Sequence, residues 1–85
     1  MTLKIESFSD ESASTIRLIG RIRAEHLPEL EAQIRMAPSR IVMDLEEVSL
    51  VDMEVVRFLG ACEARGATLL NCSPYIRDWI DKEQG

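Results

Sequence analysis

The stretch R-I-V-M-D-L-E-E-V-S-L-V-D-M-E-V-V-R-F-L-G-A-C-E-A-R, residues 40–65, carries the clearest structural signals in the chain. Residues 41–45 are a short run of aliphatic and β-branched side chains, which favours a buried strand. Two glutamates and a second apolar patch follow, and we expect a loop over residues 46–51. Asp52 then opens a helical pattern. The stretch predicts a strand, a loop and a helix in succession.

Asp52 is the expected N-cap of this helix, because its carboxylate can accept a hydrogen bond from a backbone N–H of the first turn. Val51 and Val56 then occupy the two positions of a hydrophobic staple. Ser49 and Asp52 also fit a Ser-x-x-Asp capping pattern, so the helix could begin one turn earlier. Gly66 is a natural helix end. The apolar face is expected to contain Val55, Val56, Leu59 and Cys62.

Before this stretch, residues 3–8 and 14–19 alternate apolar and polar side chains as strands do, and Gly20 is expected to end the second strand. A helix follows Pro28, which suits the first helical turn, and Pro38 is expected to end it. Its buried stripe has helical spacing: Leu27, Leu30, Ile34 and Ala37.

After it, residues 67–72 predict another buried strand, parallel to residues 41–45 because a helix connects the two. Ser73 and Pro74 resemble the N-cap and first residue of a last helix. Its expected apolar face contains Ile76, Trp79 and Ile80.

Length and composition indicate one globular domain over residues 1–85. No apolar run approaches the ~20 residues that span a bilayer, and no signal peptide is evident. We therefore expect a cytoplasmic protein that does not insert into a membrane. A net charge of −5 without a basic stripe argues against a nucleic-acid partner.

Little in the sequence suggests catalysis. Four acidic residues come close together along the chain, but no nucleophile or base accompanies them, and we expect Asp44 to pair with Arg17. The four glycines stand alone, so there is no phosphate-binding loop. Cys62 and Cys72 are expected to be free thiols that pack as small apolar side chains, and a lone His26 makes no metal site. We expect neither enzymatic activity nor a cofactor or metal. The acidic residues are Asp44, Glu46, Glu47 and Asp52.

The run I-V-M-D-L-E-E-V-S-L-V-D resembles the central strand and loop of STAS domains, the fold of anti-sigma factor antagonists. The stretches L-I-G-R-I and L-L-N-C-S-P-Y-I-R-D-W-I resemble an early strand and a late strand with its Ser-Pro-opened helix. The resemblance covers essentially the whole chain. It implies an α/β fold, a single STAS-like domain with a mixed four-stranded sheet in the order β-β-α-β-α-β-α and with helices mainly on one face.

In this family the loop leads to Asp-Ser-Ser-Gly or Asp-Ser-Thr-Gly at the helix start, and a partner kinase phosphorylates the first serine. Asp52 matches the aspartate, whereas Met53 stands at the phosphorylatable position. The resemblance implies a non-catalytic protein-interaction module like an anti-sigma factor antagonist, active in signalling and transcription regulation but without the usual serine. Its partner would be an anti-sigma factor or serine kinase. An alternative is a STAS-type accessory subunit of a membrane transport complex, which would bind a transporter ATPase.

The expected partner-binding surface is the loop of residues 46–51 with the exposed side of the following helix. Asp52 can serve there as a plain N-cap, as a partner contact, or as both. Glu54 either imitates a phosphate or only suits the helix dipole. Phe58 either completes the core or anchors a partner. The full set of expected partner-binding residues is Ser49, Asp52, Met53, Glu54, Arg57 and Phe58.

Overall fold

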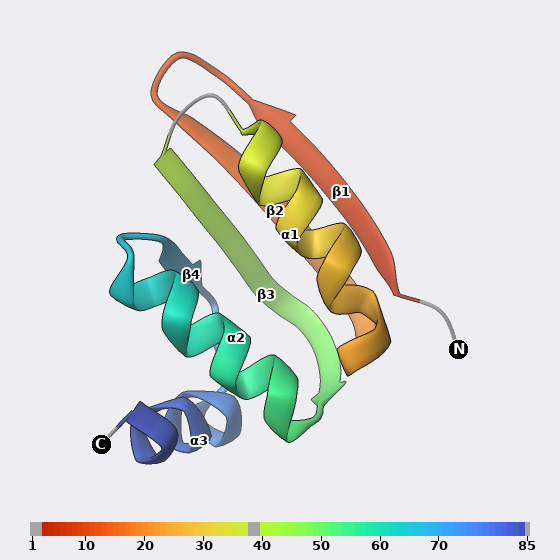
Figure 1. The fold of residues 1–85 in the computed structure, drawn as a ribbon, viewed down its shortest axis with the longest axis vertical. Coiled ribbons are helices and arrows are strands. Elements are labelled where there is room, and N and C mark those ends of the chain that lie inside the picture. Colours follow the sequence, from red (N-terminus) through yellow and green to blue (C-terminus); the bar gives the residue numbers. More distant parts are fainter. Residues whose placement is uncertain (1–2, 38–39, 85) are drawn as a thin grey trace.

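Strands and helices follow one another in the order β-β-α-β-α-β-α (Figure 1). The computed structural model describes residues 3–37 and 40–84. None of the helices in this part of the chain has the length and hydropathy needed to cross a bilayer. The elements are β1 (Lys4–Ser9), β2 (Ala13–Ile22), the short 3-10 turn η1 (Ala24–His26), α1 (Leu27–Met36), β3 (Arg40–Val51), α2 (Met53–Ala64), β4 (Thr68–Leu70) and α3 (Pro74–Gln84).

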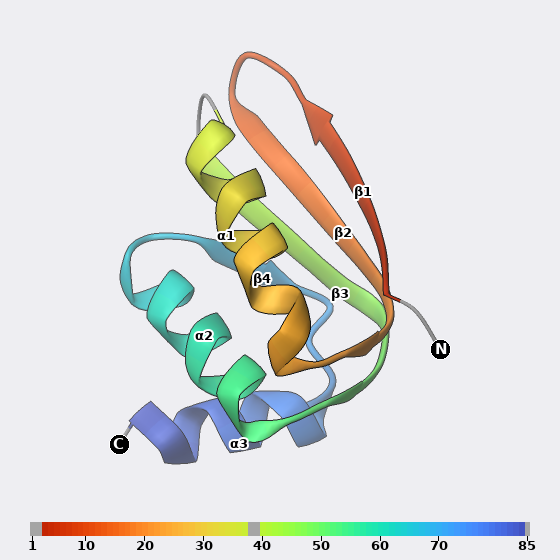
Figure 2. The same ribbon diagram turned by 45° about the vertical axis from the view of Figure 1, so that its right-hand side comes forward.

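The four strands form one mixed sheet in the order β1-β2-β3-β4. β1 pairs antiparallel with β2, whereas β2 with β3 and β3 with β4 are parallel pairs. Helices α1 and α2 lie on the same face of the sheet, and α3 packs against α2 (Figures 1 and 2). The predicted α/β architecture, with a mixed four-stranded sheet and its helices mainly on one face, is confirmed.

The core lies between this face of the sheet and the helices. Alternate residues of β2 point into it, because successive side chains of a strand face opposite sides. The predicted apolar stripes of α2 and α3 close the core from the other side. Its most deeply buried side chains are Leu18, Ile22, Leu30, Met43, Val55, Val56, Leu59 and Ile80.

β3 is longer than predicted, and the expected loop over residues 46–51 is wrong because these residues continue the strand. β2 pairs with β3 over its full length, and this supplies backbone partners for the added residues. Two register shifts, between Arg17 and Ile19 and between Gly20 and Arg21, each leave one extra residue on β3. Each extra residue changes which positions face inward. The apolar side chains of β3 that are buried or pack against the core are therefore Ile41, Met43, Leu45, Val48 and Val51.

Two other strand boundaries also differ from the sequence prediction. β2 does not end at Gly20 but continues to Ile22, and Gly20 has a φ of 105° beside the second register shift. Glycine adopts positive φ without the steric penalty that other residues incur, so the strand passes through it. β4 covers only Thr68–Leu70 of the predicted residues 67–72, because Asn71 turns the chain with a φ of 55°.

The helix ends follow the predicted capping chemistry. In α1, Pro28 lies in the first turn, and the helix ends at Met36; the predicted stop at Pro38 lies outside the described residues. At the end of α2, Gly66 has a φ of 106° and its N–H donates to the Glu63 carbonyl. The Oγ of Ser73 accepts a hydrogen bond from the N–H of Ile76, as expected of an N-cap.

An ion-pair network joins α3 to α2. The Arg77 guanidinium donates to both carboxylate oxygens of Glu63, at 2.7 and 2.8 Å, and also to Asp81 at 2.7 Å. A bidentate arginine–carboxylate contact is among the stronger polar contacts. Hydrogen bonding to Arg77 holds the pKa of Glu63 below its ordinary value. The pair therefore couples the docking of α3 to the charge of Glu63.

This coupling predicts a pH-dependent loss of stability. Because the pKa of Glu63 is lower in the folded state than in the unfolded state, its contribution is fully present above the unfolded pKa and is lost as the pH falls through the folded pKa. Urea unfolding of the wild type and Glu63→Gln should therefore give different free energies of unfolding at neutral pH. The difference should shrink steadily in acid.

Asp81→Asn is the matched control, because Asp81 contacts the same guanidinium but is more exposed to solvent than Glu63. Its effect should be smaller because solvent screens exposed pairs. A difference between wild type and Glu63→Gln that does not change with pH would contradict the role assigned to the Glu63–Arg77 pair.

Candidate partner-binding surface

β3 and α2 meet at Asp52. Val51 before it is buried, and Asp52 keeps an extended backbone with φ −102° and ψ 177°, so the helix begins at Met53. Asp52 Oδ1 accepts a hydrogen bond from the Val55 N–H at 3.1 Å, which confirms the predicted N-cap. Val56, the other residue of the expected staple, is buried in the same core as Val51. Local sequence therefore determines where α2 starts.

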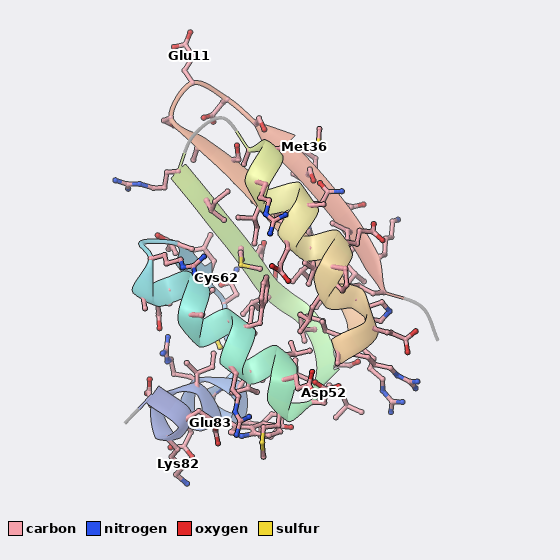
Figure 3. The ribbon with its side chains drawn as sticks, viewed as in Figure 1. Glu11, Met36, Asp52, Cys62, Lys82 and Glu83 are labelled. Carbon is pink, nitrogen blue, oxygen red and sulfur yellow. The ribbon has the colours of Figure 1, made fainter. Side chains whose placement is uncertain are left out.

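The second carboxylate oxygen of Asp52 makes a contact that the sequence did not predict. Oδ2 accepts a hydrogen bond from the Ala24 N–H at 3.0 Å. Ala24 begins the 3-10 turn that leads into α1, so one carboxylate joins the starts of two helical segments. Figure 3 places Asp52 between the start of α2 and the turn before α1. Both oxygens of Asp52 thus accept hydrogen bonds from backbone N–H groups within the chain itself.

Three of the expected partner-binding residues share the outward side of α2. Met53 is 46% exposed, and Glu54 and Arg57 are also exposed. Arg57 Nε donates to Glu83 Oε1 of α3 at 3.1 Å, so this arginine is already held in place. We call this side the outer arc of α2, formed by Met53, Glu54, Arg57, Ala61, Ala64 and Arg65. Its small alanines leave a low surface between the charged residues.

The other two residues lie apart from the outer arc. Phe58 is half-buried, packs against the core and lines a groove between α2 and α1. Ser49 is exposed on β3, at the second register shift. Sequence reasoning missed Leu50, which is 44% exposed beside Ser49. The signal was available in the three-residue spacing of Leu45, Val48 and Val51, which is the inward pattern of a bulged strand and leaves residue 50 facing out.

The carboxylates considered for catalysis have other partners. Asp44 Oδ1 accepts hydrogen bonds from the Glu46 N–H and from Asn71 Nδ2, and these two contacts lower the pKa of Asp44. Arg17 lies opposite Asp44 across the β2–β3 pair, as expected, and its charge contributes to the lowered pKa of Asp44, but the ion-pair partner of Arg17 is Glu47. The first register shift brings Glu47 within reach of Arg17, because it places Glu47 next to Ile19, two residues beyond Arg17.

The described residues offer no metal centre. Within residues 3–37 and 40–84, no three His, Cys, Asp or Glu side chains gather closely enough to hold a metal ion. Cys62 and Cys72 are free and partly buried, and burial raises the pKa of both thiols. His26 Nδ1 accepts a hydrogen bond from the Arg23 N–H and so caps the start of the 3-10 turn.

The two bonds of Asp52 can be separated by mutation. Asp52→Ala should lower the free energy of unfolding by about 1–2 kcal/mol, because it removes the N-cap and leaves the Ala24 N–H without this acceptor. Asp52→Asn keeps one carbonyl oxygen, so it can cap α2 but cannot accept both bonds. Urea denaturation should place the Asn variant between wild type and Ala. Equal losses for the two variants would contradict the cap, and an Asn variant as stable as wild type would contradict a contribution from Ala24.

Comparison with known proteins places this geometry in a known fold. No protein-family model matches the chain, and no curated protein sequence matches it significantly. Among solved structures, the anti-sigma factor antagonist SpoIIAA in its unphosphorylated form superposes with a TM-score of 0.65 at 22% identity, covering 94% of this chain and 82% of that one. The STAS domain of an antisigma-factor antagonist from Rhodobacter sphaeroides gives 0.62 at 18% identity, covering 81% and 86%. The chain therefore has the fold of a STAS domain.

Proposed function

We propose that this chain is a non-catalytic interaction module that works as an anti-sigma factor antagonist does, by binding a protein partner at the junction of β3 and α2. The observation that carries the proposal is the exposure of two large apolar side chains, Leu50 and Met53, on either side of Asp52. Protein interfaces commonly combine an apolar centre, in which Met is enriched, with a polar rim. Ser49, Glu54 and Arg57 supply that rim here.

The fold supports the same assignment. Both solved structures described above are anti-sigma factor antagonists. On this basis the partner is an anti-sigma factor, of the kind that phosphorylates its antagonist on serine. Asp52 corresponds to the aspartate before the phosphorylated serine, and here it fixes the start of the docking helix through its bonds to Val55 and Ala24.

Met53 makes the proposed interaction independent of phosphorylation at this position. A thioether has no hydroxyl to accept a phosphoryl group, so a serine kinase cannot release the partner by modifying residue 53. Glu54 adds a negative charge to the first turn, where the helix dipole favours it. The module is therefore a constitutive binder, unless the kinase acts on another serine such as the exposed Ser49.

A non-catalytic role is consistent with the carboxylates. Both oxygens of Asp52 bind backbone N–H groups, and Glu47 is paired with Arg17. Asp44 is hydrogen-bonded and has a lowered pKa, which suits it poorly to donate a proton near neutral pH. These carboxylates are engaged in hydrogen bonds and an ion pair that stabilise the fold, whereas a catalytic acid or base must be able to contact its substrate.

Restoring the family serine tests the lost switch. With the serine-kinase anti-sigma factor encoded in the same genome, the wild type should take up no phosphate and Met53→Ser should be phosphorylated at residue 53. Mass spectrometry of the tryptic peptides locates the phosphate. Phosphate on Ser49 of the wild type would show that the switch has moved, and an unmodified Met53→Ser would count against this kinase as the partner.

The docking surface is tested by a matched pair of exposed methionines. Met53→Ala should weaken partner binding by about 1–2 kcal/mol, as expected of an apolar contact near an interface centre. Met36→Ala should have no effect, because Met36 is 83% exposed at the end of α1, far from Asp52 (Figure 3). Isothermal titration with the anti-sigma factor measures both. Equal losses of affinity for Met53→Ala and Met36→Ala would contradict the β3–α2 junction as the docking site.

The same titration distinguishes the second candidate, an accessory subunit of a membrane transport complex. That role predicts binding to the transporter ATPase and none to the anti-sigma factor. The absence of a phosphorylatable residue at position 53 suits a permanent subunit as well as it suits a constitutive antagonist. Binding to the ATPase alone, weakened by Met53→Ala, would transfer the assignment to that role.

A further inference from the structure

A groove of about 620 Å³ lies between α1 and the second half of α2, with the start of β3 beneath it. It lies at the other end of α2 from Leu50 and Met53, and it shares Ala61 and Arg65 with the outer arc. Its volume falls within the range typical of small-molecule sites, roughly 300–1,000 Å³. Figure 3 shows the side chain of Cys62 on the side of α2 that faces α1.

Apolar side chains form the inner wall of the groove. They are partly buried and pack against the core, yet each contributes surface to the groove. These side chains are Ile34, Ile41, Phe58 and Cys62. Exposed apolar surface in a concavity is stabilised when a ligand removes it from water.

Small residues keep the groove open at the end of α2. Ala61, Gly66 and Ala67 line it. A Cβ added to Gly66 would meet no atom within 4 Å. The Gly66 N–H donates to the Glu63 carbonyl and the Ala67 N–H to the Cys62 carbonyl, so hydrogen bonds fix the backbone of this wall. This wall of the groove is therefore formed by backbone that its own hydrogen bonds hold in place.

The rim of the groove is basic although the chain is acidic. Three exposed arginines line it, and Glu31 is the acidic residue among its lining side chains, so the rim has an excess of two positive charges on a protein of net charge −5. Arg35 contacts Glu31 at 3.8 Å. Among the described residues, Arg40 and Arg65 have no ion-pair partner. Guanidinium groups at the mouth of an apolar groove favour a ligand with an anionic head and an apolar body.

We propose that this groove binds a small anionic amphiphile, of which a medium-chain carboxylate is the simplest member, with its chain against Phe58 and Cys62 and its carboxylate between Arg40 and Arg65. The rim selects the charge, and the apolar wall takes up the chain. This site does not depend on the proposed function, because the docking surface lies at the other end of α2.

The two cysteines provide a test within one molecule. Cys62 lines the groove and Cys72 does not. Decanoate, kept below the concentration at which it forms micelles, should slow iodoacetamide alkylation of Cys62 saturably, by about tenfold at about ten times its Kd. Alkylation of Cys72 should not change. Mass spectrometry of the two cysteine peptides gives both rates at a mildly alkaline pH.

Head-group selectivity tests the basic rim. Decyltrimethylammonium, which has the same chain and the opposite charge, should not protect Cys62. The double variant Arg40→Ala with Arg65→Ala should weaken decanoate binding by about tenfold, whereas Lys82→Ala, which removes a positive charge from α3, should not. All three positions are exposed, so these variants should fold.

Three results would overturn the proposal. The first is that decanoate protects neither cysteine, or both equally. The second is equal protection by the cationic amphiphile, which would show binding without charge selection. The third is protection by an acidic peptide without protection by decanoate, which would assign the groove to a protein segment.

Discussion

The parallel pairing of β2 with β3 positions the rest of the structure. It runs from Ala13 beside Arg40 to Ile22 beside Val51, and both strands contribute side chains to the same core. Two extra residues on β3 keep Val48 and Val51 facing inward. If either extra residue were absent, the inward face would change sides before the strand ended, and Asp52 would start α2 in the wrong direction. The helix, its cap and the surface beside it all depend on this register.

The sequence predicted elements whose signals are local. The N-cap at Asp52, the end of α2 at Gly66 and the apolar stripes of α2 and α3 each depend on side chains within a few residues of one another. For residues 46–51 the sequence predicts a loop, because two glutamates and a serine suggest one, whereas the structure continues β3 through them. Only the paired strand β2 supplies the hydrogen bonds that extend β3 through them. The same limit applies to Gly20, whose positive φ is accommodated inside a strand.

The candidate sites also contain features that local sequence predicts and features that depend on residues far apart in the chain. Met53, Glu54 and Arg57 could be placed together from helical spacing alone, and the structure places them on one arc. The bond from Asp52 to Ala24 joins residues 28 positions apart, and no pattern in the sequence indicates it. The groove is still harder to predict from the sequence, because its walls come from α1, from the start of β3 and from the end of α2. Phe58 lies beside the outer arc along α2, but its side chain packs into the groove wall.

The order of the strands has a consequence for how the chain can fold during synthesis. Each strand pairs with the one that precedes it along the chain, so no strand must wait for a later one before it joins the sheet. A nascent chain can form the β1–β2 hairpin first, add β3 once α1 has emerged, and close the core with α2. The last edge of the sheet is β4, only three residues long, which offers little backbone for another chain to pair with. A partly synthesised domain would thus expose the edge of β3 at Val42–Asp44 until α2 and β4 leave the ribosome.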